Sequence, residues 1–232
     1  FIERILNQLR EEGHRIKLLR NEHSYKVCKA RNKLIDNDDY GNPFVYRGDD
    51  DTILEPDVFQ KLLDTIHQGF DACSGVIPNC GDPPIVRSTK KVKPIISRID
   101  IDKEGTPTYV GDDCGYKFLT DEIIPTHHFR TYFLYKSEIQ KKVRYEGGVS
   151  QTGYREEAFF SLRAMQLGYK MAVRSGVVTW DVRTPSGGCR DEDYAQKLML
   201  NEEKFFLWMK RFYAQHGDVI GRYTKEVTHG KD

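Results

Sequence analysis

The sequence predicts an α/β fold in which helices flank a mostly parallel sheet. Short β-prone segments alternate with amphipathic helical segments, and this rhythm favours parallel strands joined by right-handed crossovers. A run of acidic residues directly follows one predicted strand, at the edge where open α/β sheets bind ligands. The 232 residues, 38% of them hydrophobic, are enough for one large domain with a sizeable core.

The first part of the chain contains short predicted elements in close succession. Helical spacing of apolar residues predicts a helix that begins at Ile2 and ends near Gly13, and alternation predicts a strand over 15–20. A helix over 27–35 and a strand over 44–46 come next. Pro56 suits the first turn of another helix, whose apolar side chains recur at helical spacing as far as Ile66.

The rest of the chain adds an insertion, further strands and a long final helix. Residues 80–125 are predicted to form a loop and hairpin insertion beside the ligand edge, with strands over 95–101 and 107–110. We expect other strands over 73–76, 129–135, 169–173 and 177–180, and helices over 136–143, 156–167 and 191–215. One domain is therefore expected over 1–190, followed by a C-terminal helix and a loosely ordered tail over 191–232.

Composition argues against several classes of protein. A formal net charge of +1 gives no argument for binding to nucleic acid or a membrane. The five cysteines are scattered and include no Cys-x-x-Cys pair, so we expect reduced thiols in the cytoplasm, with no disulfide framework or zinc site. No apolar run is long enough for a membrane span and we expect no signal peptide, so work at a membrane would require peripheral association or a partner.

Three consecutive carboxylates, Asp49, Asp50 and Asp51, follow the predicted strand over 44–46. A divalent cation would relieve their repulsion, and hard ions such as Mg²⁺ or Mn²⁺ take carboxylate oxygens and leave positions for phosphate. Asp49 and Asp51 point the same way in an extended loop, so we expect the metal on Asp51 with Asp49 nearby. An EF-hand is excluded because Ile53 and Leu54 occupy its ligand and glycine positions. A solvated acidic surface is the alternative interpretation.

Glu156 and Glu157 are expected in the first turn of a helix, where unpaired N–H groups and the helix dipole favour negative side chains. One interpretation is that they only stabilise this helix end. The other is that an ionised carboxylate facing a cleft accepts a proton at neutral pH. With a metal at the acidic loop, the second interpretation predicts sugar transfer with inversion from a nucleotide diphosphate to a hydroxyl group.

Several short blocks occur in a fixed order along the sequence. They are Arg20-Asn21-Glu22, Ala30-Arg31-Asn32-Lys33, Asp49-Asp50-Asp51 with Glu55-Pro56-Asp57, Arg155-Glu156-Glu157 with Leu162-Arg163-Ala164 and Gly168-Tyr169-Lys170, and Thr179-Trp180-Asp181 with Pro185-Ser186-Gly187-Gly188. In this order the blocks resemble the family 2 glycosyltransferases of the GT-A fold. One block alone would be weak, but the ordered set is specific and covers the chain from about residue 16 to 188.

The resemblance implies roles for the matching residues. It implies an Asp-x-Asp motif with Asp51 on the metal and Asp49 near the ribose and the cation, and it puts Asp50 on the same nucleotide-binding loop. Glu157 occupies the catalytic-base position, which is usually an aspartate in this family. Arg31 matches an arginine that lies against the nucleotide.

Two departures from the family pattern concern the metal and the nucleotide base. Asp181 stands where relatives often have a histidine near the metal and diphosphate; it could still ligate a cation, although it adds negative charge. Relatives begin with a strand, a helix and a second strand that bind the base, and Phe1 is expected to fall after them, as in an N-terminally truncated domain. Arg183 and Arg190, on a glycine-rich loop, could fold over a diphosphate or be ordinary surface arginines.

Other candidate residues carry weaker signals. His127 and His128 are candidate metal ligands. Adjacent residues on a strand point to opposite faces, so at most one of the two could line a site. Trp180 is expected either in the core or as a wall of the sugar pocket.

We therefore predict an inverting glycosyltransferase that uses Mn²⁺ or Mg²⁺. Its predicted donor is a UDP- or GDP-sugar, and its acceptor is a hydroxyl group of a glycan, a lipid-linked molecule or another compound, reached from the side of the 80–125 insertion. No nucleic-acid partner is expected. The alternatives are a nucleotidyltransferase, and a non-catalytic carbohydrate-binding protein that keeps the fold.

Overall fold

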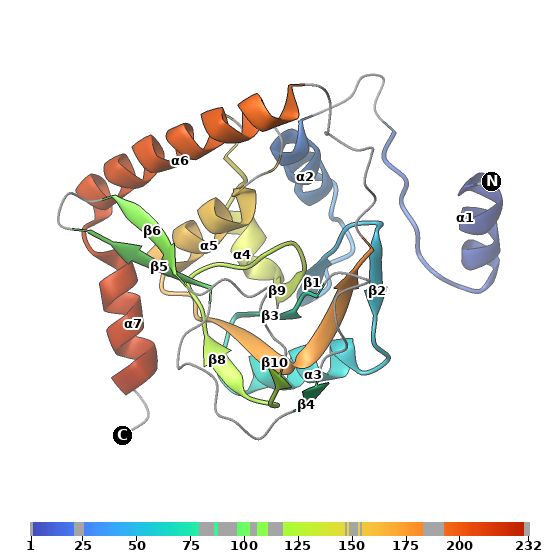
Figure 1. The fold of residues 1–232 in the computed structure, drawn as a ribbon. Helices are drawn as coiled ribbons and strands as arrows, with labels where there is room; N and C mark the ends of the chain where they lie inside the picture. Colours follow the sequence, from blue (N-terminus) through green and yellow to red (C-terminus); the bar gives the residue numbers. More distant parts are fainter. Residues whose placement is uncertain are drawn as a thin grey trace.

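A central mixed sheet with helices on both faces organises the protein (Figure 1). The computed structural model describes residues 2–20, 26–78, 86–87, 97–102, 106–110, 118–146, 148, 153, 155–182 and 193–229. Within these ranges the sheet has six strands, and the predicted α/β class is confirmed.

The strands of this sheet run in both directions. Their order is β1, β9, β3, β10 and β2, and β8 also pairs with β10. Of the described pairs, β3 with β10 is parallel, and the other pairs are antiparallel. The prediction of a mostly parallel sheet is therefore wrong, because hydrophobic periodicity reports which face of a strand is buried and not the direction in which it runs. The strands are β1 (Phe44–Arg47), β2 (Thr52–Leu54), β3 (Ala72–Val76), β8 (Ile123–Pro125), β9 (Phe133–Lys136) and β10 (Met171–Asp181).

Each face of the sheet packs against its own group of helices. On β9, Phe133 and Tyr135 belong to the large core cluster with α5 (Glu156–Gln166), whereas Leu134 between them packs with α3 (Val58–His67). This alternation is what the two-residue period of a strand requires when both faces are covered. The sheet is therefore the middle layer between α3 and the group of α4 (Ser137–Lys142) and α5.

The C-terminal helices complete the large core. α6 (Tyr194–His216) runs along the top of the view, and α7 (Val219–His229) turns at its C-terminal end and runs down the left side (Figure 1). Val219, Ile220, Tyr223 and Val227 of α7 are buried in the same cluster as α5. The expectation of a loosely ordered tail from Val219 is thus wrong, because these four side chains recur at helical spacing and form one apolar stripe.

A close approach of two backbones shapes the middle of the sheet. The pairing of β10 with β3 shifts register between Val173 and Val178. A Cβ atom on Gly75 of β3 would lie 2.5 Å from the carbonyl oxygen of Val177, so no other residue fits there without movement. The two strands predicted over 169–173 and 177–180 are consequently one irregular strand.

Most other predicted elements are present. The helices α1 (Ile2–Glu11) and α2 (Val27–Asp36) and the hairpin of β5 (Arg98–Ile101) and β6 (Pro107–Val110) are confirmed. A further small sheet pairs β4 (Val86–Arg87) with β7 (Phe118–Leu119). No strand forms over 15–20, where Leu18 is 45% exposed, because alternation without a neighbouring strand leaves the backbone unpaired. Within the described ranges, no helix is both long and apolar enough to cross a membrane.

Candidate active site

The acidic loop lies between β1 and β2, at the end of β10. The backbone N–H of Val182 donates to the carbonyl oxygen of Asp51 at 2.9 Å, and Asp181 is the register partner of Thr52. The Thr52 hydroxyl donates to the carbonyl oxygen of Asp49 at 2.8 Å, which closes the loop on itself. Segments far apart in the sequence therefore bring Asp49, Asp51 and Asp181 to one edge of the sheet.

Tyr132, directly before β9, lies among these carboxylates. Its hydroxyl donates to Asp51 Oδ1 at 3.4 Å, and the side chain is almost fully buried. Burial raises the pKa of Tyr132, and the negative charges of Asp181, Asp49 and Asp51 raise it further. The hydroxyl therefore keeps its proton and remains a donor toward the acids.

The residues present suit a metal that the substrate helps to bind. Within the described ranges, no three His, Cys, Asp or Glu side chains lie close enough to hold a metal by themselves. Asp49 is held by Arg31, whereas Asp51 accepts from the Tyr132 hydroxyl, whose pKa is also raised by the charge of Asp181. Mg²⁺ is typically bound by one or two carboxylates together with substrate phosphates, so this donor set fits such an ion.

A chain of ion pairs connects the acidic loop with the two glutamates of α5. Arg31 on α2 donates from Nη2 to Asp49 Oδ1 at 2.6 Å and from Nε to Glu156 Oε1 at 2.8 Å. Arg47, the last residue of β1, donates from Nη2 to Glu156 Oε1 and to Glu157 Oε1, the latter at 2.9 Å. The predicted base and the predicted metal loop are therefore joined through two arginines.

The two glutamates differ in exposure and in partners. The Glu156 side chain is 2% exposed and contacts both arginines, whereas that of Glu157 is 14% exposed and contacts Arg47. Burial raises the pKa of Glu157 to about 7; Arg47 opposes this shift and Glu156 adds to it. Three carboxylates, those of Asp49, Glu156 and Glu157, share the two guanidinium groups of Arg31 and Arg47, so the cations do not fully balance the acids.

Backbone geometry at the start of α5 fixes both glutamates. Arg155, the N-cap residue, has a left-handed backbone with φ of 68°. Its guanidinium binds Glu202 of α6 through Nε and Nη2, both at 3.1 Å. A non-glycine residue in this region is strained, and the bidentate pair to a second helix holds it in place. The acids are thus presented by a clamped helix end.

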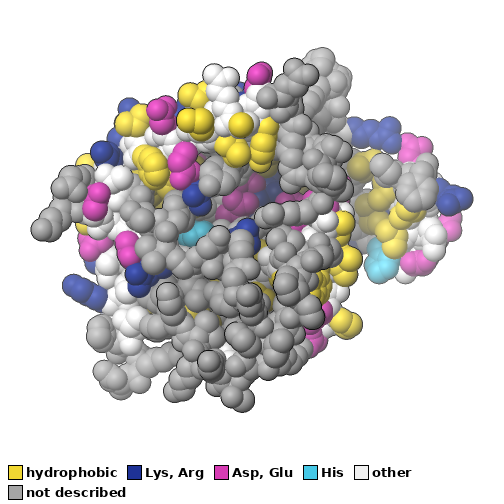
Figure 2. Space-filling model, in the orientation of Figure 1, with side chains coloured by type: hydrophobic (Ala, Val, Ile, Leu, Met, Phe, Trp, Pro, Cys, Tyr) yellow, Lys and Arg dark blue, Asp and Glu magenta, His cyan; other side chains and the backbone are white. Residues whose placement is uncertain are grey.

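The other predicted residues lie in different settings. Asp50 is exposed on the loop, and Trp180 packs against the cluster that contains Val178. His127 is buried, with Nδ1 beside the backbone of Ile99 and Nε2 at 2.9 Å from the Thr224 hydroxyl, so its surroundings are those of a core residue. Arg183 and Arg190 fall outside the described residues. Figure 2 shows acidic and basic side chains together beneath α6, where α2 and α5 approach one another.

Comparison with known protein families shows which family has this sequence pattern. The family model described as glycosyl transferase family 2 matches residues 2–124, more than half of the chain. The chain belongs to glycosyl transferase family 2. Comparison of the sequence with curated proteins gives no significant match.

A solved glycosyltransferase shares the fold of this family 2 domain. The structure of GalNAc-T7 with UDP, GalNAc and Mn²⁺ matches with a TM-score of 0.62 and 13% sequence identity. The match covers 98% of this chain and 48% of that one, so the present chain spans about half the length of that protein. At this identity the likeness establishes a common GT-A fold, as predicted.

Two residues of the candidate site were not predicted from the sequence. Arg47 follows a β-prone run and precedes the acids, and a charged residue at the end of a buried strand is the signal that could have found it. Tyr132 falls inside an aromatic run that was assigned to a core strand, and no local pattern separates it from its neighbours. The contacts of both residues join segments far apart in the sequence.

Proposed function

We propose that this chain transfers a sugar from a nucleoside diphosphate donor to a hydroxyl acceptor, with inversion at the anomeric carbon. The observation that carries the proposal is the chain of ion pairs from Asp49 through Arg31, Glu156 and Arg47 to Glu157. It supports a single site in which the donor phosphates and a proton acceptor face the same sugar. Family membership gives the reaction class, and the geometry suggests the division of roles.

Glu157 is the proposed general base. The acceptor hydroxyl passes its proton to a Glu157 oxygen while the acceptor oxygen bonds to the anomeric carbon. The bond from that carbon to the phosphate oxygen breaks, and the nucleoside diphosphate leaves with the electron pair. A pKa near neutrality suits this step, because a base is most effective when its pKa is close to the working pH.

The remaining residues hold the donor and the base. Asp51 and Asp181 would hold Mn²⁺ or Mg²⁺, which supplies charge neutralisation for the diphosphate leaving group. Arg31 and Asp49 lie where the nucleotide would approach this loop, and Asp50 is exposed beside them. Arg47 and Glu156 are positioning residues, since they are buried and contact Glu157 or each other. We assign the transfer reaction to residues 1–190 and leave Arg183 as a proposed diphosphate contact.

The first experiment identifies the leaving group. UDP- and GDP-sugars labelled in the sugar are incubated with the protein, Mn²⁺ and hydroxyl acceptors. Release of nucleoside diphosphate with a labelled product of inverted anomeric configuration, measured by NMR, is the expected result. Release of labelled sugar 1-phosphate would favour nucleotidyl transfer, and a product with retained configuration would remove Glu157 from the role of base. UDP-GalNAc is the first donor to test, because the GalNAc-T7 structure contains UDP and GalNAc.

The metal assignment has its own test. Replacing Asp51→Ala should weaken Mn²⁺-dependent binding of UDP by roughly tenfold, because one of two charged oxygen ligands is lost. Calorimetric titration of UDP with and without Mn²⁺ measures the effect. Asp64→Ala, on the exposed side of α3, is the matched control and should bind UDP like the parent protein. Equal loss in both variants, or none in Asp51→Ala, would contradict the assignment.

A further inference from the structure

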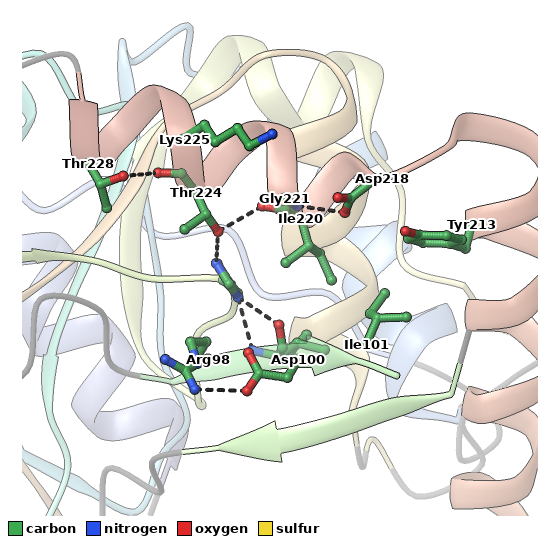
Figure 3. Close-up of a pocket in the computed structure, with 12 residues that line it drawn as sticks. Arg98, Asp100, Ile101, Tyr213, Asp218, Ile220, Gly221, Thr224, Lys225 and Thr228 are labelled. Atoms are coloured by element: carbon green, nitrogen blue, oxygen red, sulfur yellow. Dashed lines mark hydrogen bonds and ion pairs between the residues drawn. The ribbon is translucent and has the colours of Figure 1, made fainter. Parts of the chain in front are cut away.

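A second concave region lies away from the proposed transfer site. A pocket of about 560 Å³ opens between β5 and α7, and the end of α6 closes one side (Figure 3). Its lining includes neither the acidic loop nor the glutamates of α5. The hairpin and α7 lie on the left in Figure 1, and the acidic loop lies beside β2 on the right. The volume falls within the range of small-molecule sites, which is about 300–1,000 Å³.

The floor of this pocket is held by hydrogen bonds. His127 Nδ1 lies 2.9 Å from the backbone nitrogen and 3.1 Å from the carbonyl oxygen of Ile99, and its Nε2 lies 2.9 Å from the Thr224 hydroxyl oxygen. Thr224 in turn donates to the carbonyl oxygen of Ile220 at 2.8 Å. These contacts join β5 to α7, and they leave the pocket preformed.

The charges around the pocket balance. Arg98 and Lys225 are matched by Asp100 and Asp218. Arg98 Nη2 lies 2.8 Å from Asp100 Oδ2, and Asp218 Oδ1 accepts from the backbone N–H of Gly221 at 2.7 Å. Phosphate groups are recognised by several cations in excess of anions, and the described residues that line this pocket include no such excess. A neutral ligand is therefore favoured over a nucleotide or a phosphorylated compound.

The lining combines apolar surface with groups that exchange hydrogen bonds. The ring of Tyr213 and the side chain of Ile101 lie at one end, and Thr228 lies at the other (Figure 3). The side chains of Arg98 and Asp100 are 41% and 49% exposed at the rim, and a carboxylate accepts several hydrogen bonds at once. A pyranose ring has the matching chemistry, because it presents a face of C–H bonds and an edge of hydroxyl groups.

We propose that this pocket binds a neutral sugar ring, with Tyr213 and Ile101 against its apolar face and Asp100 and Arg98 on its hydroxyl groups. Such a site would hold a glycan independently of the transfer step. Binding can therefore be measured whether or not the proposed transfer reaction is found.

The test measures sugar binding to the whole chain by saturation-transfer NMR and calorimetry. The neutral probes are the methyl glycosides of glucose, galactose, mannose, N-acetylglucosamine and N-acetylgalactosamine, and their disaccharides. Inorganic phosphate and glucose 6-phosphate are the anionic probes. We expect at least one neutral probe to bind with a Kd in the millimolar range, more tightly than either anion. UDP with Mn²⁺ should leave this binding unchanged, because it would occupy the other site.

Variants assign the binding to the pocket. Asp100→Ala and Tyr213→Ala should each raise the Kd for the sugar roughly tenfold, because each removes a contact group. Thr228→Trp, at an exposed position, should block one end without disturbing the core. Tyr194→Ala, at the start of the same helix as Tyr213, is the control and should bind normally. Three results with the parent protein would overturn the proposal: no binding of a neutral sugar, tighter binding of the anions, or displacement of the sugar by UDP. Normal sugar binding by the Asp100→Ala and Thr228→Trp variants, with unchanged thermal stability, would also overturn it.

Discussion

The start of α5 and the base of the α7 pocket each enclose an ionisable side chain, but they surround it with different partners. Glu157 contacts a buried arginine beside a second glutamate, whereas the hydrogen-bond partners of His127 are a neutral backbone and a hydroxyl. Burial disfavours the charged form in both places, so it raises the pKa of Glu157 to about 7 and lowers that of His127 to about 4. Glu157 can therefore exchange a proton near neutral pH, while His127 stays neutral and connects β5 with α7.

The largest expected effect is on turnover. Glu157→Gln keeps the size of the side chain but removes the proton acceptor, so we expect turnover to fall by roughly a hundredfold or more with nucleotide binding nearly unchanged. The parent enzyme should gain activity as pH rises through about 7, and this rise should vanish in the variant. Initial rates and UDP titrations measure both quantities.

Glu138→Gln is the matched control for that experiment. Glu138 also lies in the first turn of a helix, but it is exposed on α4, and the described ion pairs of Arg47 are to Glu156 and Glu157 instead. Its replacement should leave turnover unchanged. Equal losses in the two variants would show that a negative helix end, and not proton transfer, is what the reaction requires.

The second effect is on stability. Arg47→Met should lower the free energy of unfolding by about 3–5 kcal/mol, because it leaves two enclosed carboxylates without their shared cation. Loss of that cation should also move the pKa of Glu157 further upward, which the pH profile of the reaction reports. Urea denaturation measures the stability.

An exposed arginine provides the comparison. Arg144 pairs with Asp36 at 3.0 Å, and the two side chains are 46% and 60% exposed. Arg144→Met should therefore cost about 1 kcal/mol or less. If both arginine variants lost the same small amount, the buried network would contribute no more than a surface ion pair.

The smallest of the three effects depends on pH. Because the pKa of His127 is about 4 in the folded protein and about 6.5 in the unfolded chain, the unfolded chain binds more protons between these values. Stability from neutral His127 is complete above about pH 6.5 and is lost as pH falls, by up to about 3 kcal/mol near pH 4. His127→Gln should remove this part of the acid sensitivity, so the stability curves of parent and variant should converge at low pH. Parallel curves would contradict the assignment.

Sequence periodicity was sufficient for the helices and insufficient for the pairing of strands. The apolar stripes of α2, α3 and α5 are local, so their spacing predicted these elements well. β2 escaped prediction because it has three residues and exposes Ile53, and its partner lies more than a hundred residues away. α7 was missed for a different reason: the prediction gave more weight to its charged residues than to the helical spacing of its apolar ones, which pack on the large core.

The site divides in the same way. The acidic loop and the glutamates stood out because clustered like charges need a chemical explanation. Arg47 and Tyr132 did not stand out, because their importance comes from contacts with Glu157 and Asp51 that the fold alone creates.

The short strand β2 has a consequence for any attempt to alter the proposed metal site. Its ladder to β10 pairs Ile53 with Trp180 and Thr52 with Asp181, and the next backbone bond reaches Asp51. The pairing of these two strand ends thereby sets the spacing between Asp51 and Asp181. Exchanging either acid for asparagine or histidine would change the proposed ligand but leave the spacing between the two backbone positions unchanged.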